Sequence, residues 1–175
     1  MTLYIQRVEC ELRRLRGELL PAQPGLATVR FEVQCRAEPA DVLAKVKDVL
    51  ARLDDIIASR PSTSDQNLAV ALPAWFLTAC APEQTQQEAE RWLAWWRTLP
   101  PEKQQEAEDA QPWSLPQWLH WMRPQQRTWY WFECDIAAGR ELLLAVEVDG
   151  WPFPWGSLRW LFLAAGAASV APGEA

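Results

Sequence analysis

The stretch TWYWFECDIAAGRELLLAVEVD, residues 128–149, decides the fold because two segments of alternating character flank a short turn. Apolar residues at every second position are typical of a β-strand that buries one face. The glycine at position 139 suits the left-handed position of a tight loop. We therefore predict a C-terminal β-hairpin over about residues 128–149.

The parity of the two strands selects the length of this loop. Only an odd number of loop residues brings the apolar positions of both strands to one face. We predict a three-residue loop, residues 137–139, with Gly139 in the left-handed conformation. The apolar face then carries Tyr130, Phe132, Cys134, Ile136, Leu142, Leu144, Val146 and Val148.

The other face of the predicted hairpin is the first candidate site. In this register Trp129 lies opposite Glu147, Trp131 opposite Ala145, and Asp135 opposite Glu141. Two indoles beside a carboxylate favour stacking on a sugar or a planar ligand, or anchoring a protein partner. The structural alternative is that helices cover the Trp end while the acidic end meets water.

The loop DGWPFPWGS, residues 149–157, is the second candidate. Two prolines stiffen it, and Trp151, Phe153 and Trp155 are difficult to hide together in so short a loop. A rigid aromatic loop is typical of a recognition element. The alternative is a plug that closes one end of the core. A last helix is predicted from Ser157, as its cap, to Gly166.

The N-terminal third predicts three elements. Residues 3–19 carry apolar side chains at alternating intervals of three and four, which favours a helix that ends before Pro21, with a strand as the alternative. Residues 28–35 alternate as a half-buried strand does. The pattern leaves open whether that strand pairs with the hairpin. A helix begins at Pro39 and lays one apolar face, residues 42–57, on the fold.

The middle of the chain holds two similar strings, RWLAWWR at residues 91–97 and QWLHWMR at residues 117–123. The first is placed on a helix opened by Pro82 and the second on a short helix capped by Ser114. We interpret them as two helices that each lay an aromatic face on the fold. Between them, residues 100–112 are polar, acidic and bounded by prolines, which predicts a surface loop.

Helices and strands that do not alternate regularly indicate the α+β class. We predict a single domain, residues 1–175, in which an antiparallel sheet that includes the hairpin packs with several amphipathic helices. The C-terminal residues 168–175 are expected to form a frayed tail.

Composition narrows the classes of function. The formal charge of −6 and the sequence pI near 4.9 argue against nucleic acid as a partner. The longest apolar run is too short to span a bilayer, and the N-terminus lacks the pattern of a secretory signal. Four dispersed cysteines and a single histidine complete no metal-ligand spacing. We expect a cytoplasmic protein that uses no metal and no cofactor.

No catalytic set can be assembled from these residues. His120 is the only histidine, and the sequence contains no phosphate-binding glycine loop and no nucleophile elbow. The leading hypothesis is a non-enzymatic protein that binds another protein, as inhibitors, immunity proteins and chaperone-like adaptors do. The alternative is a small-ligand binding domain or an atypical enzyme with a Trp-lined cleft. The candidate binding residues are Trp129, Trp131, Glu147, Trp151, Phe153 and Trp155.

Overall fold

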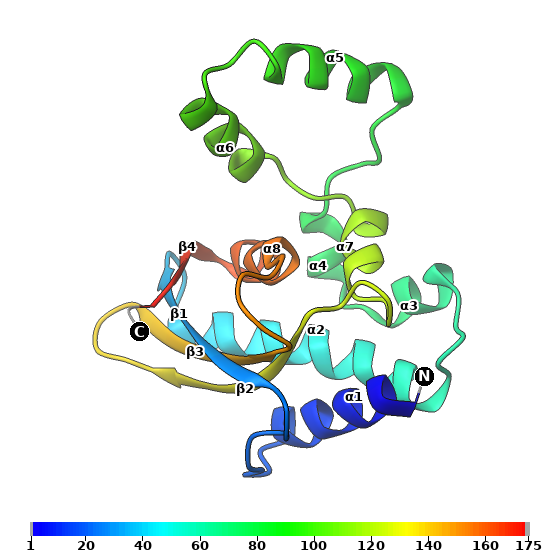
Figure 1. Ribbon diagram of the computed structural model, residues 1–175, viewed down its shortest axis with the longest axis vertical. Coiled ribbons are helices and arrows are strands. Elements are labelled where there is room, and N and C mark those ends of the chain that lie inside the picture. The colour runs from blue at the N-terminus through cyan, green and yellow to red at the C-terminus, as the bar shows by residue number, and fades with distance from the viewer. Residues whose placement is uncertain (1, 174–175) are drawn as a thin grey trace.

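The computed structural model describes residues 2–173 and has the predicted α+β architecture (Figure 1). The elements in chain order are α1 (Thr2–Leu15), β1 (Ala27–Cys35), α2 (Pro39–Ser59), α3 (Asp65–Ala71), α4 (Ala74–Ala79), α5 (Gln86–Trp96), α6 (Pro101–Ala110), α7 (Leu115–Trp121), β2 (Trp129–Ile136), β3 (Glu141–Val148), α8 (Gly156–Ala165) and β4 (Ala167–Pro172).

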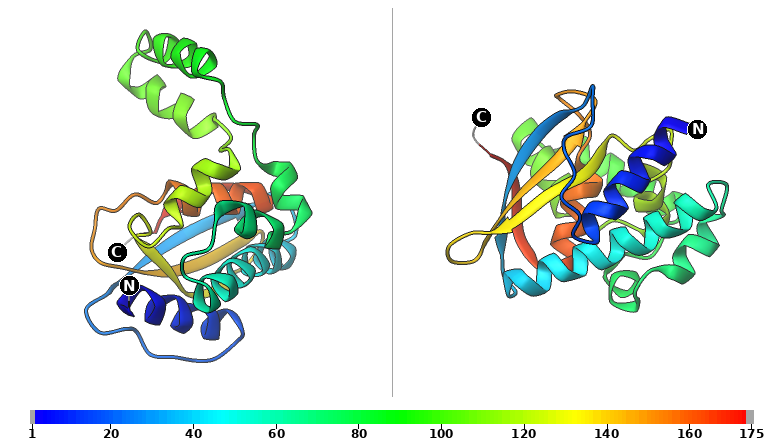
Figure 2. Two further views of the ribbon diagram at one scale, coloured as in Figure 1. Left: turned by 90° about the vertical axis from the view of Figure 1, so that its right-hand side faces the viewer. Right: turned by 90° about the horizontal axis from the view of Figure 1, so that it is seen from below.

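The four strands form one antiparallel sheet in the order β2-β3-β1-β4. The predicted hairpin is its β2-β3 pair, and β1 pairs directly with β3, which answers the question that the sequence left open. The helices gather on one side of the sheet, as the right-hand view of Figure 2 shows. The core lies between the sheet and the helices, where Phe31 and Leu144 of the sheet pack with Val46 of α2 and Phe162 of α8.

The three predicted N-terminal elements form, but the first helix is shorter than the predicted 3–19, since it ends at Leu15 and leaves Leu19 fully exposed. Residues 2–15 are helical, and the chain leaves the helix at Gly17, whose φ of 94° suits glycine. The helix α2 has Pro39 in its first turn and buries the predicted apolar face. The segment around Pro73 forms two short helices, α3 and α4, because proline provides no N–H to continue the first.

The hairpin has the predicted kind of loop but not the predicted register. The Ala137 N–H donates to the Glu141 carbonyl at 2.9 Å, so the three-residue loop is 138–140, one position further along. Gly139 has the expected left-handed φ of 77°. Close to the loop Cys134 pairs with Leu144, and the predicted parity is confirmed there.

A β-bulge at Phe132 reverses that parity in the far half of the hairpin. Beyond it Trp131 pairs with Val146, and Tyr130 pairs with Glu147. All three predicted pairings are therefore wrong. The shifted loop places Asp135 opposite Leu143 rather than Glu141. The bulge adds one residue between the loop and residues 129–131, so Trp129 and Trp131 point to the other face and lie opposite Val148 and Val146 rather than Glu147 and Ala145. The two indoles and the Glu147 carboxylate lie on opposite faces of the sheet.

Three further predictions are corrected. Residues 167–172 form β4, which pairs with β1, so the frayed tail is wrong for this part; residues 174–175 lie outside the described residues. Helix α8 begins at Gly156, and the side chain of Ser157 makes no cap. Residues 101–110 are helix α6 rather than a loop, since Pro101 in the first turn is compatible with a helix.

The helix that carries RWLAWWR does not lie on the core. It begins at Gln86 rather than Pro82, and together with α6 it projects from the body of the molecule, at the top of Figure 1. We call residues 82–112 the arm. Helix α7, which carries QWLHWMR, behaves as predicted and buries Trp118 and Leu119.

Candidate functional site: the arm and its base

The strand tryptophans of the predicted site lie in the interior. Trp129 and Trp131 are buried. The Trp129 indole N–H donates to Ser157 Oγ at 2.9 Å, and the Trp118 indole N–H donates to the Ser157 carbonyl at 3.0 Å. Ser157 thus fixes two indoles across the core, which satisfies polar groups that burial would otherwise leave without a partner.

Glu147 is fully buried and fully engaged. Both of its oxygens accept hydrogen bonds from Arg14, at 2.7 and 3.0 Å, and both accept from Gln23, at 2.6 and 2.8 Å. Burial alone raises the pKa of Glu147, but these hydrogen bonds outweigh it and hold the pKa below its usual value. The carboxylate therefore ties α1 and the α1–β1 connection to the sheet.

The loop between β3 and α8 is divided between core and surface. Phe153 is buried and lies edge-on to Phe31, with ring centroids 6.2 Å apart. The centroid of the Trp155 ring lies 5.2 Å from that of Phe31. Trp151 packs on Phe153 and keeps 55% of its surface exposed. Of the six predicted residues, Trp151 is the one with a large accessible surface, and the structure does not assemble the six into one cleft.

A second buried ion cluster holds α1 and α2 to the edge of the sheet. Arg127 donates to Glu11, and its other terminal nitrogen donates to Asp54 at 2.8 Å. Glu11 also accepts the Trp131 backbone N–H of the edge strand β2, at 2.6 Å. One guanidinium faces two carboxylates, and burial together with Asp54 raises the pKa of Glu11 well above its usual value.

Helix α5 of the arm forms by its own local chemistry. Thr85 accepts the Glu88 N–H, and the Glu88 carboxylate accepts the Thr85 N–H, which is a capping box. These bonds hold the pKa of Glu88 below its usual value, so it is ionised at neutral pH. The Thr-x-x-Glu spacing was readable in the sequence, and it marks the true start of the helix.

The two helices of the arm are joined through Trp96 and Gln104. The Trp96 indole N–H donates to the Gln104 carbonyl at 3.2 Å, and the Gln104 amide donates to the Leu99 carbonyl at 3.0 Å. Trp92 stacks on Trp96, with ring centroids 6.3 Å apart. The arm is therefore a small helical hairpin with its own aromatic contact.

Every residue of α5 and α6 keeps accessible surface. Trp95 is 51% exposed and its neighbour Leu93 is 37% exposed. Around them the arm carries seven acidic and three basic residues, a net charge of −4 out of −6 for the whole chain. The arm thus presents a large aromatic side chain in a negative field.

The arm is anchored where its two ends meet. The Ala81 N–H donates to the Trp113 carbonyl at 2.9 Å, and the two ends form a single parallel bridge there. The Trp113 ring lies over Gly156 so closely that a Cβ at this position would approach the ring to 2.7 Å. Arg159 of α8 donates to the Asp109 carbonyl at 3.0 Å.

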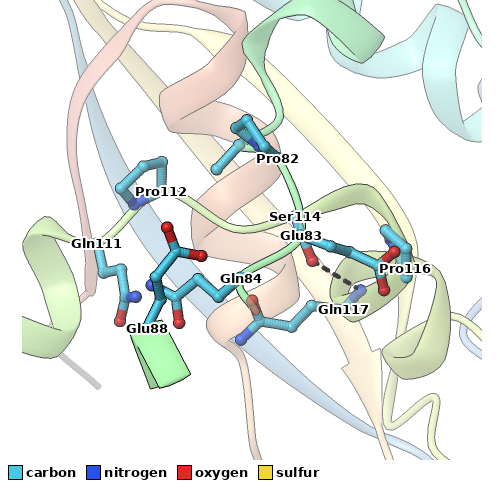
Figure 3. A pocket seen from close by; sticks show the side chains of 10 residues that line it. Pro82, Glu83, Gln84, Glu88, Gln111, Pro112, Ser114, Pro116 and Gln117 are labelled. Atoms are coloured by element: carbon cyan, nitrogen blue, oxygen red, sulfur yellow. Dashed lines mark hydrogen bonds between the residues drawn. The ribbon is translucent and has the colours of Figure 1, made fainter. Parts of the chain in front are cut away.

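Two adjoining cavities lie at this base and share Gln111 and Gln117 in their walls. The larger, about 630 Å³, is drawn in Figure 3, where the side chains of Gln84, Glu88 and Gln111 lie close to one another. The smaller, about 380 Å³, has both Trp92 and Trp113 in its wall. Together we call them the base groove. It is polar and acidic, with two indoles at one end.

The tryptophans of the arm were not among the predicted binding residues. Trp92, Trp95 and Trp96 have the i, i+3, i+4 spacing of an apolar helix face, and such a face is usually buried. Two neighbouring features indicated an exposed segment instead: prolines bound the arm, and α6 is almost entirely polar. A polar helix beside an aromatic one, with prolines on both sides, is the sequence signal of the projecting hairpin.

Comparison with known proteins provides no relative for this chain. A scan against protein-family models, a search of curated proteins and a search of solved structures each return no match. Within residues 2–173 none of the helices combines the length and the apolar character that crossing a membrane requires. Across the same residues no three His, Cys, Asp or Glu side chains gather as metal ligands do.

Proposed function

We propose that this chain is a non-enzymatic binding protein that engages a partner protein through its arm. The observation that supports the proposal is Trp95, an indole 51% exposed near the end of a helix that takes no part in the core. Interfaces concentrate their binding energy in large aromatic side chains of this kind. An inhibitor, an immunity protein or an adaptor works in this way.

The charge of the arm favours a basic partner. Four of the six net negative charges lie on residues 82–112, so the arm attracts a positive surface and repels an acidic one. The four cysteines are free, as is usual in the reducing cytoplasm, where we place the interaction.

A small-ligand function is the alternative proposal, and it has less support. Trp129, Trp131 and Glu147 are buried in the body, so a ligand cannot reach them without displacing core. Among the cavities lined by described residues, the smaller part of the base groove has two indoles in its wall, and neither comes from the predicted set.

Affinity capture from extract of the native host tests the proposal when three baits are compared. We expect a partner that is retained by the unmodified chain and by Trp151→Ala, and lost with Trp95→Ala. A buried hot-spot indole contributes about 2 kcal/mol, which corresponds to about a thirtyfold loss of affinity. Trp151 is the matched control because it is equally exposed but lies on the body.

Direct titration of the captured partner completes the test. A partner that binds Trp95→Ala as tightly as the unmodified chain contradicts the role of the arm. A partner lost with Trp151→Ala instead places the interface at the loop between β3 and α8.

A further inference from the structure

The base groove differs from the rest of the acidic surface because it combines carboxylates with indoles in one cavity. Trp92 of α5 and Trp113, at the end of the arm, line the smaller cavity together with Glu108 of α6. A cation gains from the negative face of an indole and from a carboxylate at the same time. This pairing selects positively charged ligands over neutral aromatic ones.

Two carboxylates of the groove, Glu83 and Glu108, are exposed and available to a ligand. Asp109 lies 3.3 Å from Arg159 and accepts a hydrogen bond from Gln105, whereas Glu108 is exposed and forms no salt bridge among residues 2–173. In the larger cavity Glu83 is exposed, Glu88 is exposed but closes the capping box with Thr85, and the ten lining residues include no Arg, Lys or His. Arg159 also lies in the wall of the smaller cavity, where it balances the charge of Asp109, so Glu108 is the carboxylate that faces a ligand without a cation of its own.

The glutamines of the groove suit a polypeptide. Gln84, Gln111 and Gln117 each offer a donor and an acceptor, which is what an extended backbone needs. Gln111 and Gln117 border both cavities, so a segment that crosses the larger cavity reaches the indoles of the smaller one.

We propose that the base groove binds a basic segment of the partner polypeptide, with one arginine or lysine side chain entering the cavity lined by Trp92 and Trp113. The inference deepens the proposed function and rests on it. It assigns the exposed Trp95 to contact with the surface of the partner, and the base groove to recognition of its charge.

The test uses an acetylated and amidated peptide of alternating glycine and arginine, and the same peptide with citrulline for arginine. Citrulline keeps the shape of arginine and removes its charge. Titration into the ¹⁵N-labelled chain is followed at the indole N–H signals of Trp92 and Trp113. We expect both signals to shift with the arginine peptide, the shifts to weaken as salt is added, and the citrulline peptide to leave them unchanged.

Two substitutions locate the site. Glu108→Gln is expected to weaken binding of the arginine peptide about threefold and Trp92→Leu about tenfold, as for loss of a partly desolvated cation–π contact. The controls are Glu102→Gln, which removes one charge elsewhere on α6, and Trp151→Leu. Because Trp92→Leu also perturbs the stacking within the arm, Glu108→Gln is the deciding variant.

Several results overturn the inference. Equal weakening by Glu102→Gln and Glu108→Gln means that the peptide senses only net charge. Unshifted Trp92 and Trp113 signals mean that it binds elsewhere. Ethylguanidinium binding as tightly as the peptide means that the cavity is a small-cation site. If the partner still depends on Trp95 in these cases, the arm interaction stands without the groove; if Trp95→Ala has no effect on capture, the proposed function itself fails.

Discussion

Arg127 and Glu147 show how single buried charges organise this fold. Each lies inside the protein with its partners supplied by distant parts of the chain, α1 and α2 for Arg127, and α1 and the following connection for Glu147. Such groups are costly to bury alone, so they specify one arrangement of α1 against the sheet. They are structural groups, although carboxylates beside indoles also fit a binding site.

Replacing Arg127 is expected to destabilise the protein strongly. Arg127→Met leaves Glu11 and Asp54 buried without their cation, at a cost of about 3–5 kcal/mol in the free energy of unfolding. Arg123→Met is the control, because Arg123 pairs with Asp65 at the surface and such pairs contribute about 0–1 kcal/mol. Urea denaturation of both variants measures the difference, and equal costs would contradict a buried cluster.

The raised pKa of Glu11 predicts a dependence of stability on pH. Between the usual carboxyl pKa and the raised value, the native state binds more protons than the unfolded state, so stability is full below this window and falls as pH rises through it. Glu147 acts with the opposite sign: its pKa is lowered, and its contribution is present above the usual carboxyl pKa and lost as pH falls below it.

Asp54→Asn is expected to flatten the decline of stability that occurs as pH rises above the usual carboxyl pKa. The physical reason is that the negative charge of Asp54 helps to raise the pKa of Glu11, and asparagine removes this charge while keeping an acceptor for Arg127. Asp55→Asn, which changes an exposed neighbour, is the control. Urea denaturation at several pH values above the usual carboxyl pKa measures how steeply the free energy of unfolding falls with pH. If the fall is as steep in Asp54→Asn as in the unmodified chain, Asp54 does not raise the pKa of Glu11.

The bulge at Phe132 explains why the predicted site at Trp129, Trp131 and Glu147 does not form. The alternation of apolar residues correctly predicted that Cys134 and Leu144 share a face. Beyond the extra residue of the bulge the side chains change faces, so Trp129 and Trp131 point into the core. Alternation predicts a face only as far as the strand stays regular, and no signal in TWYWFECDI marks where the bulge falls. The placement of the strand indoles therefore had to come from the structure.

Among the elements, those with a strong apolar period were predicted, whereas α6 and β4 were missed. Helix α2 and strand β1 carry strong periodic patterns because one face of each is buried, and both form as expected. Helix α6 has few apolar residues to generate a period, so its composition resembled a loop. Its helix depends on Pro101 in the first turn and on contacts within the arm.

The caps of α5 and α7 test whether the arm is independent of the body. Thr85→Ala removes the cap of α5 and costs about 1 kcal/mol locally, so amide exchange is expected to speed up within residues 86–96 while the melting temperature stays unchanged. Ser114→Ala removes the cap of α7, which buries Trp118, and lowers the melting temperature.

Hydrogen exchange monitored by mass spectrometry, together with calorimetry, separates these outcomes. A fall in melting temperature with Thr85→Ala equal to that with Ser114→Ala would show that α5 unfolds with the core and is no separate arm.

At the scale of the molecule, the arm and the body have different physical origins. The body is a sheet whose helices share one core, and its α+β class was predictable from the hairpin and the amphipathic helices. The arm is an insertion between α4 and α7, whose ends meet at Ala81 and Trp113. An insertion whose ends lie together adds little strain to the domain that carries it.

Replacing residues 82–112 by a short Gly-Ser linker is therefore expected to leave a folded body. Every helix of the arm keeps accessible surface, so its removal takes little apolar area from the core, and the free energy of unfolding should change by about 1 kcal/mol or less. Near-ultraviolet circular dichroism and urea denaturation check this. A matched variant keeps the arm and carries Gly156→Ala, which forces the Trp113 ring to move.

The two variants together separate anchoring from folding. If the body is autonomous, the deletion unfolds cooperatively and loses the partner, whereas Gly156→Ala keeps the stability of the body and weakens only ligands that need Trp113 in place. A deletion that does not unfold cooperatively shows that the arm belongs to the core after all. A Gly156→Ala variant that binds the arginine peptide as tightly as the unmodified chain shows that Trp113 need not stay over Gly156 for the base groove to work.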